Sequence, residues 1–173
     1  MDNDKPTIAV SKNLFRIALI DALIVLLMVF LPTFSHMLSF PLYKFEPMRI
    51  MVLAGYLLSA NKKNAYGLAI ILPLFSFITT GHPLFIKSVL MISELTINVF
   101  LFSFLVEKKL NVFFAMLASI VLSKVFYYSI KFVLISTGIM NTNLIDTQIG
   151  IQVLISCVIA LAFALVHKPL KSK

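Results

Sequence analysis

The sequence is poor in the residues that commonly build soluble folds and catalytic sites. Only 13% of its 173 residues are charged, and Cys157 is the single cysteine. A single cysteine excludes a disulfide within the chain and a cysteine-ligated metal site, and its apolar surroundings indicate a packing role. The sequence contains no HExxH, GxSxG or phosphate-loop motif, and no histidine beside a nucleophile. We therefore expect no enzyme, no catalytic residue and no bound cofactor.

Apolar residues, in contrast, make up 60% of the chain. A water-soluble domain of this length cannot bury that much apolar surface, so the composition predicts an integral membrane protein. Six apolar runs predict six transmembrane helices, at residues 14–32, 48–60, 65–80, 84–106, 110–136 and 148–166. Six crossings use roughly 120 residues. The expected fold is therefore one all-α transmembrane domain, residues 1–173, forming a compact six-helix bundle.

Positive charges at alternate connections predict the orientation of this bundle. Lysine and arginine gather before the first run, at residues 62–63 and 108–109, and in the tail, whereas the connections between these positions hold few cations. The positive-inside rule then places both termini in the cytoplasm of a multi-pass protein of the cell inner (plasma) membrane. Orientation and contact with anionic lipid explain the net charge of +8, so nucleic acid is not an expected partner.

Two segments depart from a simple bundle. The second run gives only roughly 20 Å of helix against about 30 Å of hydrocarbon, so its neighbours must bury it, or it must extend toward Phe45. The connection from Leu31 to Pro47 is long and apolar, and we expect it to close over the outer face as a lid.

Pro73 predicts a kink in the third helix. The backbone groups that the proline frees are expected to bond to nearby hydroxyls, those of Ser76, Thr79 and Thr80.

Ionisable residues inside the apolar runs are the strongest functional signal. Helical spacing places polar residues on one face of two helices, namely Lys87, Glu94 and Asn98 in the fourth and Lys124, Tyr127, Tyr128 and Lys131 in the fifth. One interpretation is structural, with Glu94 paired to Lys124 or Lys131 and Lys87 reaching the outer interface. The other is that both faces line a cavity whose excess of lysine suits a carboxylate or phosphate of a ligand.

Two further pairs lie in the outward connections. Glu46 and Arg49, three residues apart, are expected to form a local ion pair, and their outward position makes both candidate ligand contacts. His36 and His82 could meet across the mouth of the bundle. Two histidines without a third ligand are a weak signal for a metal, so no metal site is predicted.

The first helix carries a candidate docking surface. Ala18 and Ala22 are four residues apart, and small residues at this spacing let helices approach closely. Asp21 lies between them, and we expect it to pair with Arg16 or with a cation on another helix or subunit.

Six crossings, a long outward first connection, the AxxxA pair Ala18 and Ala22, and the run LPLFSFITTGHP from Leu72 to Pro83 together resemble the substrate-binding S component of energy-coupling factor (ECF) transporters. The resemblance spans most of the chain. It implies capture of a small, vitamin-like nutrient, anionic or zwitterionic, and docking through the two alanines on a transmembrane coupling subunit with two ATPase subunits. The implied substrate contacts are His36, Glu46, Arg49, His82, Glu94, Asn98, Lys124, Tyr127 and Lys131.

Three alternatives stay open on the sequence. A structural or assembly protein of the cell envelope would use the charges only to tie helices together. A stand-alone secondary carrier would use Glu94 and Lys131 as a proton or ion relay. An intramembrane enzyme would need His36 and His82 to act with Glu46.

Overall fold

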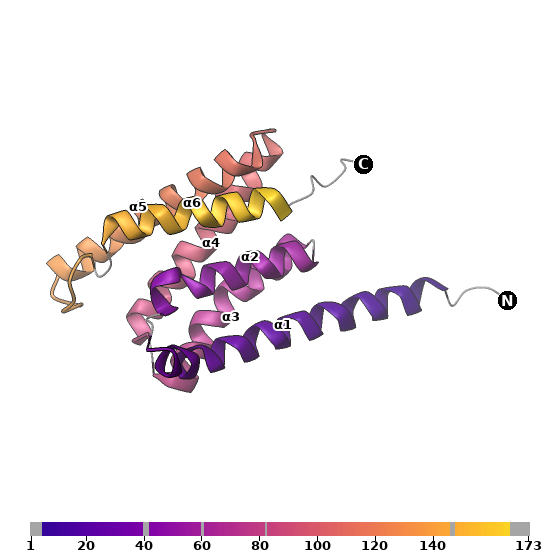
Figure 1. Ribbon diagram of the computed structural model, residues 1–173, viewed down its shortest axis with the longest axis horizontal. Helices are drawn as coiled ribbons and strands as arrows, with labels where there is room; N and C mark the ends of the chain where they lie inside the picture. The colour runs from indigo at the N-terminus through magenta and orange to yellow at the C-terminus, as the bar shows by residue number, and fades with distance from the viewer. Residues whose placement is uncertain (1–4, 40–41, 60, 82, 146–147, 167–173) are drawn as a thin grey trace.

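The computed structural model describes residues 5–39, 42–59, 61–81, 83–145 and 148–166. These residues form six α-helices, a short 3₁₀ helix and no strand. The elements are α1 (Lys5–Met37), η1 (Leu42–Phe45), α2 (Pro47–Ser59), α3 (Lys62–Thr80), α4 (Phe85–Glu107), α5 (Val112–Ser136) and α6 (Ile149–Val166). Successive helices run in opposite directions, so that α1 begins and α6 ends at one end of the bundle, here the terminal end (Figure 1). The opposite end, which includes η1, is the loop end.

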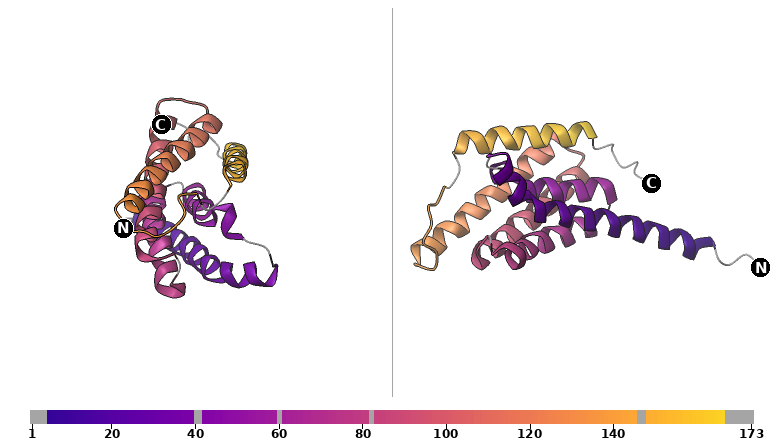
Figure 2. Two further views of the ribbon diagram at one scale, coloured as in Figure 1. Left: turned by 90° about the vertical axis from the view of Figure 1, so that its left-hand side faces the viewer. Right: turned by 60° about the horizontal axis from the view of Figure 1, so that its bottom comes forward.

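The helices form two layers. Seen end-on, α3, α4 and α5 stand in one layer, while α1, α2 and α6 form the other (Figure 2). The short α2 lies at the centre and packs against α1, α3, α4 and α6. Its neighbours therefore bury it, as the length of the second apolar run requires.

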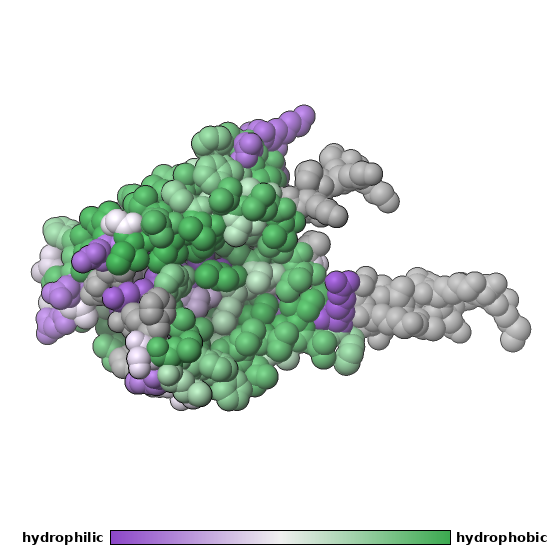
Figure 3. Space-filling view, viewed as in Figure 1, coloured by the Kyte–Doolittle hydropathy of each residue, from purple (hydrophilic) through white to green (hydrophobic). Residues whose placement is uncertain are grey.

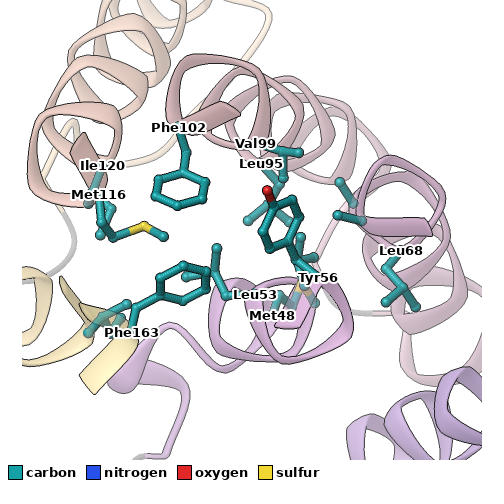
Figure 4. Packing of buried hydrophobic residues seen from close by; sticks show 14 of the residues in the cluster. Met48, Leu53, Tyr56, Leu68, Leu95, Val99, Phe102, Met116, Ile120 and Phe163 are labelled. Carbon is teal, nitrogen blue, oxygen red and sulfur yellow. The ribbon is translucent and has the colours of Figure 1, made fainter. Parts of the chain in front are cut away.

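Aromatic rings join the two layers around α2. Tyr56 of α2 meets Phe102 of α4 edge to face at 5.6 Å between ring centroids, and Phe102 meets Phe163 of α6 at 5.0 Å (Figure 4). Met116 and Ile120 of α5 complete this core and are fully buried. Such aromatic contacts contribute about 0.5–1.5 kcal/mol each beyond the burial of area.

Local sequence explains where several helices begin and end. The Asn61 side chain accepts a hydrogen bond from the Lys63 amide at 3.0 Å and caps α3, and Asn111 caps α5 through the Phe113 amide at 2.9 Å. Gly81 follows α3 with a φ of 68°, a left-handed conformation that glycine adopts without steric cost.

The outward surface of the bundle is apolar. Four helices are long and apolar enough to cross a membrane: Leu14–Met37, Phe85–Glu107, Val112–Ser136 and Ile149–Val166. Large apolar side chains are exposed to a high fraction, for example 65% for Leu154 of α6 and 75% for Ile78 of α3. The face drawn in Figure 3 is largely hydrophobic over α1 and α6. A helix with apolar residues on every side has its place in a protein core or in lipid.

Pro32 acts differently from the sequence prediction. The first helix was expected to end near Pro32, yet α1 includes Pro32 and continues to Met37, because a proline removes one hydrogen bond while the flanking turns stay bonded. The connection to α2 therefore begins after Met37 and not at Leu31. Ser35 ties it back to α1 by accepting a bond from the Leu42 amide at 3.3 Å.

Pro73 lies buried within α3, which is helical on both sides of it. The hydroxyls of Thr79 and Thr80 donate to the carbonyls of Phe75 and Ser76, at 2.8 and 2.7 Å. These carbonyls follow the proline in the chain. The backbone carbonyl that the proline leaves without a helical donor lies one turn before it, so the two threonines do not donate to that carbonyl. The prediction about these two hydroxyls is wrong, because each bonds the carbonyl four residues before it.

Candidate functional site

Four charged side chains meet inside the bundle near the loop end. Glu46 immediately precedes α2, Arg49 lies in the first turn of α2, Glu94 lies in α4 and Lys124 in α5. Arg49 forms ion pairs with both Glu46 and Glu94, and Lys124 pairs with Glu46. We call these four residues the charged cluster. It joins three helices and the connection after α1.

Helix geometry accounts for this arrangement. Glu46 directly precedes α2 and Arg49 lies in its first turn, and their side chains form the predicted local pair, which is confirmed. Because α2 packs against α4, the same guanidinium reaches Glu94. Pairing of Glu94 with Lys124 or Lys131 was expected, and for Lys124 that prediction is wrong: its ammonium group binds Glu46 instead.

The charged cluster is removed from solvent, and its charges cancel. The Arg49 side chain is 3% exposed, and those of Glu94, Lys124 and Glu46 are 13%, 17% and 19% exposed. Two carboxylates face two cations, which keeps the desolvated charges compensated. Removing one partner of such a buried pair typically costs about 3–5 kcal/mol, because the other charge is left unpaired.

Glu46 has an unusual backbone. Its φ of 54° is left-handed, a conformation that costs a residue with a Cβ roughly 1–2 kcal/mol. Its carbonyl accepts the Ile50 amide at 3.2 Å, and Pro47 follows as the first residue of α2, where a proline is well tolerated. The carboxylate lies near the positive end of the α2 dipole. Ion pairing and the helix dipole therefore both favour this position and offset the backbone cost.

A cavity of about 370 Å³ adjoins the charged cluster between α5 and α6. Its polar lining residues are Lys124, Tyr128, Gln152 and Ser156. Tyr128 donates to the Gln152 side-chain oxygen at 2.9 Å, and Lys124 approaches the same oxygen at 3.4 Å. Apolar side chains form the rest of the wall: Leu117, Val121, Val125, Leu144, Ile145, Ile149 and Val153. The cavity thus suits a small molecule with an apolar body and one polar end.

A second hollow lies along α5 alone. It measures about 580 Å³, and its lining residues are Val125, Tyr128, Ser129, Phe132 and Val133. None of these is charged, and all of them lie on α5. The smaller cavity is the better candidate because residues of two helices line it and one of them, Lys124, belongs to the charged cluster. In Figure 3 hydrophilic residues lie near the loop end, between the apolar surfaces of α6 and α1.

Three predicted contacts lie apart from the charged cluster. Asn98 donates to Ser119 at 3.1 Å and ties α4 to α5, while its own oxygen is buried without a partner among the described residues. Tyr127 packs with Leu90 and Met140. Lys131 is 1% exposed and lies two helical turns, roughly 10 Å, beyond Lys124 along α5.

The predicted histidines do not form a site that can be described. His36 is exposed in the last turn of α1, and His82 lies outside the described residues. In the part of the chain that the structure describes, no group of three histidine, cysteine or acidic residues could hold a metal ion.

The terminal half of the bundle has its own polar contacts. Asp21 accepts a hydrogen bond from the side-chain amide of Asn64 at 2.8 Å, so its described partner is a neutral group of α3. Ala18 and Ala22 are exposed on the outer side of α1. No described contact covers either alanine with another helix of the bundle.

An ion pair ties α3 to α4 at the terminal end, between Lys62 and Glu107, whose side chains are 44% and 64% exposed. The hydrogen bond from Lys62 to the Glu107 carboxylate raises the pKa of Lys62 above its ordinary value, against a smaller opposing effect of burial. This exposed pair provides a reference for the buried charged cluster.

Gln152 is a polar cavity residue that the sequence did not lead us to expect. It lies in α6 amid apolar neighbours, and its side chain contacts both Lys124 and Tyr128. An amide in an otherwise apolar helix was an available signal. Ionisable residues are a stronger signal in an apolar run, and Gln152 is not ionisable.

The structure thus defines an all-helical protein whose four long apolar helices fit a membrane and whose interior holds a charged cluster beside a cavity. Comparison of the chain with protein-family models, with curated proteins and with solved structures gives no match.

Proposed function

We propose that the chain is a membrane-embedded substrate-binding subunit that captures a small nutrient for uptake by an ATP-driven transporter of the ECF type. The observation that supports this most is the charged cluster beside the cavity of about 370 Å³. Charged groups inside an apolar bundle commonly mark the path or the site of a substrate.

In this proposal all six helices cross the membrane. The central α2 has 13 residues and α3 has 19, and both can span within the bundle because protein surrounds the shorter helix. The terminal end, with Lys62, Lys63, Lys108 and Lys109, faces the cytoplasm, and the loop end with its cavity faces outward. The exposed Ala18 and Ala22 of α1 are then available to a coupling subunit, which works with two ATPase subunits.

The cavity also indicates what kind of nutrient it takes. Its wall is mostly apolar, and its polar groups converge at the Lys124 end. A molecule with a flat or aliphatic body and a charged or zwitterionic end would place its body against α6 and its polar end at Lys124 and Gln152.

Paired substitutions of lysine test this function. Lys124→Met and Lys62→Met each remove a lysine from one ion pair with a glutamate, but only Lys124 lines the cavity. The proteins, purified gently from their own membranes, are extracted and analysed for small molecules. We expect a molecule that is retained by the wild type and by Lys62→Met, and lost by at least about tenfold from Lys124→Met. Equal retention by both variants would contradict the proposal.

One specific observation favours a second candidate, a structural or assembly protein of the cell envelope. Every member of the charged cluster has a charged partner within the chain, as expected of residues that only tie helices. That function predicts that Lys124→Met lowers stability while no small molecule accompanies the wild type.

A further inference from the structure

We propose that Glu46 occupies the position of a ligand carboxylate, and that a carboxylate-bearing ligand with an apolar body displaces it from the charged cluster. This inference rests on the proposed function and deepens it, because it names the substrate class and the residue that makes way for the substrate.

The geometry around Glu46 is that of a bound carboxylate. One of its oxygens, Oε2, accepts from Arg49, and the other, Oε1, accepts from Lys124. Two cations on the two oxygens of one carboxylate are a common way to recognise this group. Lys124 also lines the cavity, so the Glu46 carboxylate lies between Arg49 and the cavity wall. A ligand carboxylate at the Lys124 end of the cavity would reach the same cations.

The charge balance explains why displacement, rather than addition, is required. With Glu46 in place, two carboxylates compensate Arg49 and Lys124, and a further anion would meet uncompensated repulsion. Without the Glu46 carboxylate the remaining three charges sum to +1. Exchange of one carboxylate for another leaves the buried charges balanced before and after ligand binding.

Glu46 is the member of the charged cluster that is free to leave. Glu94 lies within α4, fixed by helix on both sides, whereas Glu46 lies outside the helices, directly before α2, in a left-handed conformation. Departure of its side chain would allow that backbone to relax. The Arg49 Nε group, buried and without a partner among the described residues, offers one more donor on the guanidinium that a ligand carboxylate would meet.

The first experiment compares two soluble probes of the same shape, 4-hydroxyphenylacetate and its neutral amide, 4-hydroxyphenylacetamide. Binding of each to purified wild type, Glu46→Gln and Glu107→Gln is measured by calorimetry. Glu107→Gln is the matched control, since it removes a paired carboxylate at the far end of the bundle. We expect Glu46→Gln to bind the carboxylate at least about tenfold more tightly than the wild type, with amide binding and the control unchanged.

A second measurement uses the wild type and so does not depend on the folding of a variant. Saturating carboxylate should speed hydrogen exchange at the amides of residues 42–50, whereas the amide probe should leave it unchanged. Either of two results overturns the displacement. The first is that folded Glu46→Gln binds the carboxylate no more tightly than the wild type, or does not bind it at all. The second is that the carboxylate leaves hydrogen exchange at residues 42–50 unchanged or slows it. Failure of transport with these results intact would instead refute the proposed uptake function.

Discussion

Replacement of Arg49 is the most direct test of how the charged cluster contributes to stability. Arg49→Met keeps a side chain of similar length, but it removes the only described ion-pair partner of Glu94. Glu46 retains Lys124. The variant therefore isolates one charge, the Glu94 carboxylate, in surroundings where its side chain is 13% exposed.

The expected magnitude follows from the burial of this pair. Leaving one member of a buried ion pair uncompensated costs about 3–5 kcal/mol. For a chain of this size each kcal/mol lowers the melting temperature by about 2–4 °C, so the expected decrease is roughly 6–20 °C. At the exposed pair, Lys62→Met should cost only about 0.2–1 kcal/mol.

Thermal unfolding of the detergent-solubilised protein, followed by circular dichroism, measures these differences. The double variant Arg49→Met with Glu94→Gln removes the unpaired charge, and it should recover at least half of the lost stability. The reasoning is refuted if the melting temperatures of Arg49→Met and Lys62→Met differ by less than roughly 2 °C, which corresponds to at most about 1 kcal/mol. It is also refuted if the double variant is less stable than Arg49→Met.

Two other predictions concern packing and pH. A Cβ at Gly55 would lie 2.1 Å from the Leu68 side chain, so Gly55→Val should lower the free energy of unfolding by about 1–3 kcal/mol. A Cβ at Gly67 would meet open space, so Gly67→Ala should be neutral or stabilising by up to about 1 kcal/mol. Equal effects in thermal unfolding would contradict the close α2–α3 contact. The raised pKa of Lys62 means that its small stabilising contribution is complete below about pH 10 and lost as pH rises through that pKa. The stability difference between wild type and Lys62→Met should therefore shrink as pH rises above the ordinary lysine pKa of 10.5, and a difference that grows there would contradict the Lys62–Glu107 pair.

The fold could be predicted from sequence where single-helix properties decide it. Apolar runs separated by polar breaks predicted the six helices, because length and hydropathy act within each segment. Helix ends were less predictable. Pro32 was expected to lie at the end of the first helix, but α1 continues to Met37, since a proline weakens a helix without necessarily ending it.

The site was predictable as a set of residues but not as a set of pairs. Intramembrane charges indicated Glu94 and Lys124, and spacing predicted the pair of Glu46 and Arg49. The exchange of partners, with Arg49 on Glu94 and Lys124 on Glu46, depends on how α2 packs between α4 and α6. Helix packing is a tertiary property that spacing within one helix does not contain.

Gln152 illustrates the same limit. Its role at the cavity depends on the packing of α6 against α5, which brings its side-chain amide to Lys124 and Tyr128. Its polarity alone marked it only as unusual in an apolar helix.

Native mass spectrometry of the protein released gently from its own membranes tests the central claim most directly. The account predicts a species that carries one small carboxylate-bearing molecule, together with assemblies containing a membrane coupling subunit and two ATPase subunits. A protein that carries no small molecule and is joined to cell-envelope assembly partners would contradict it.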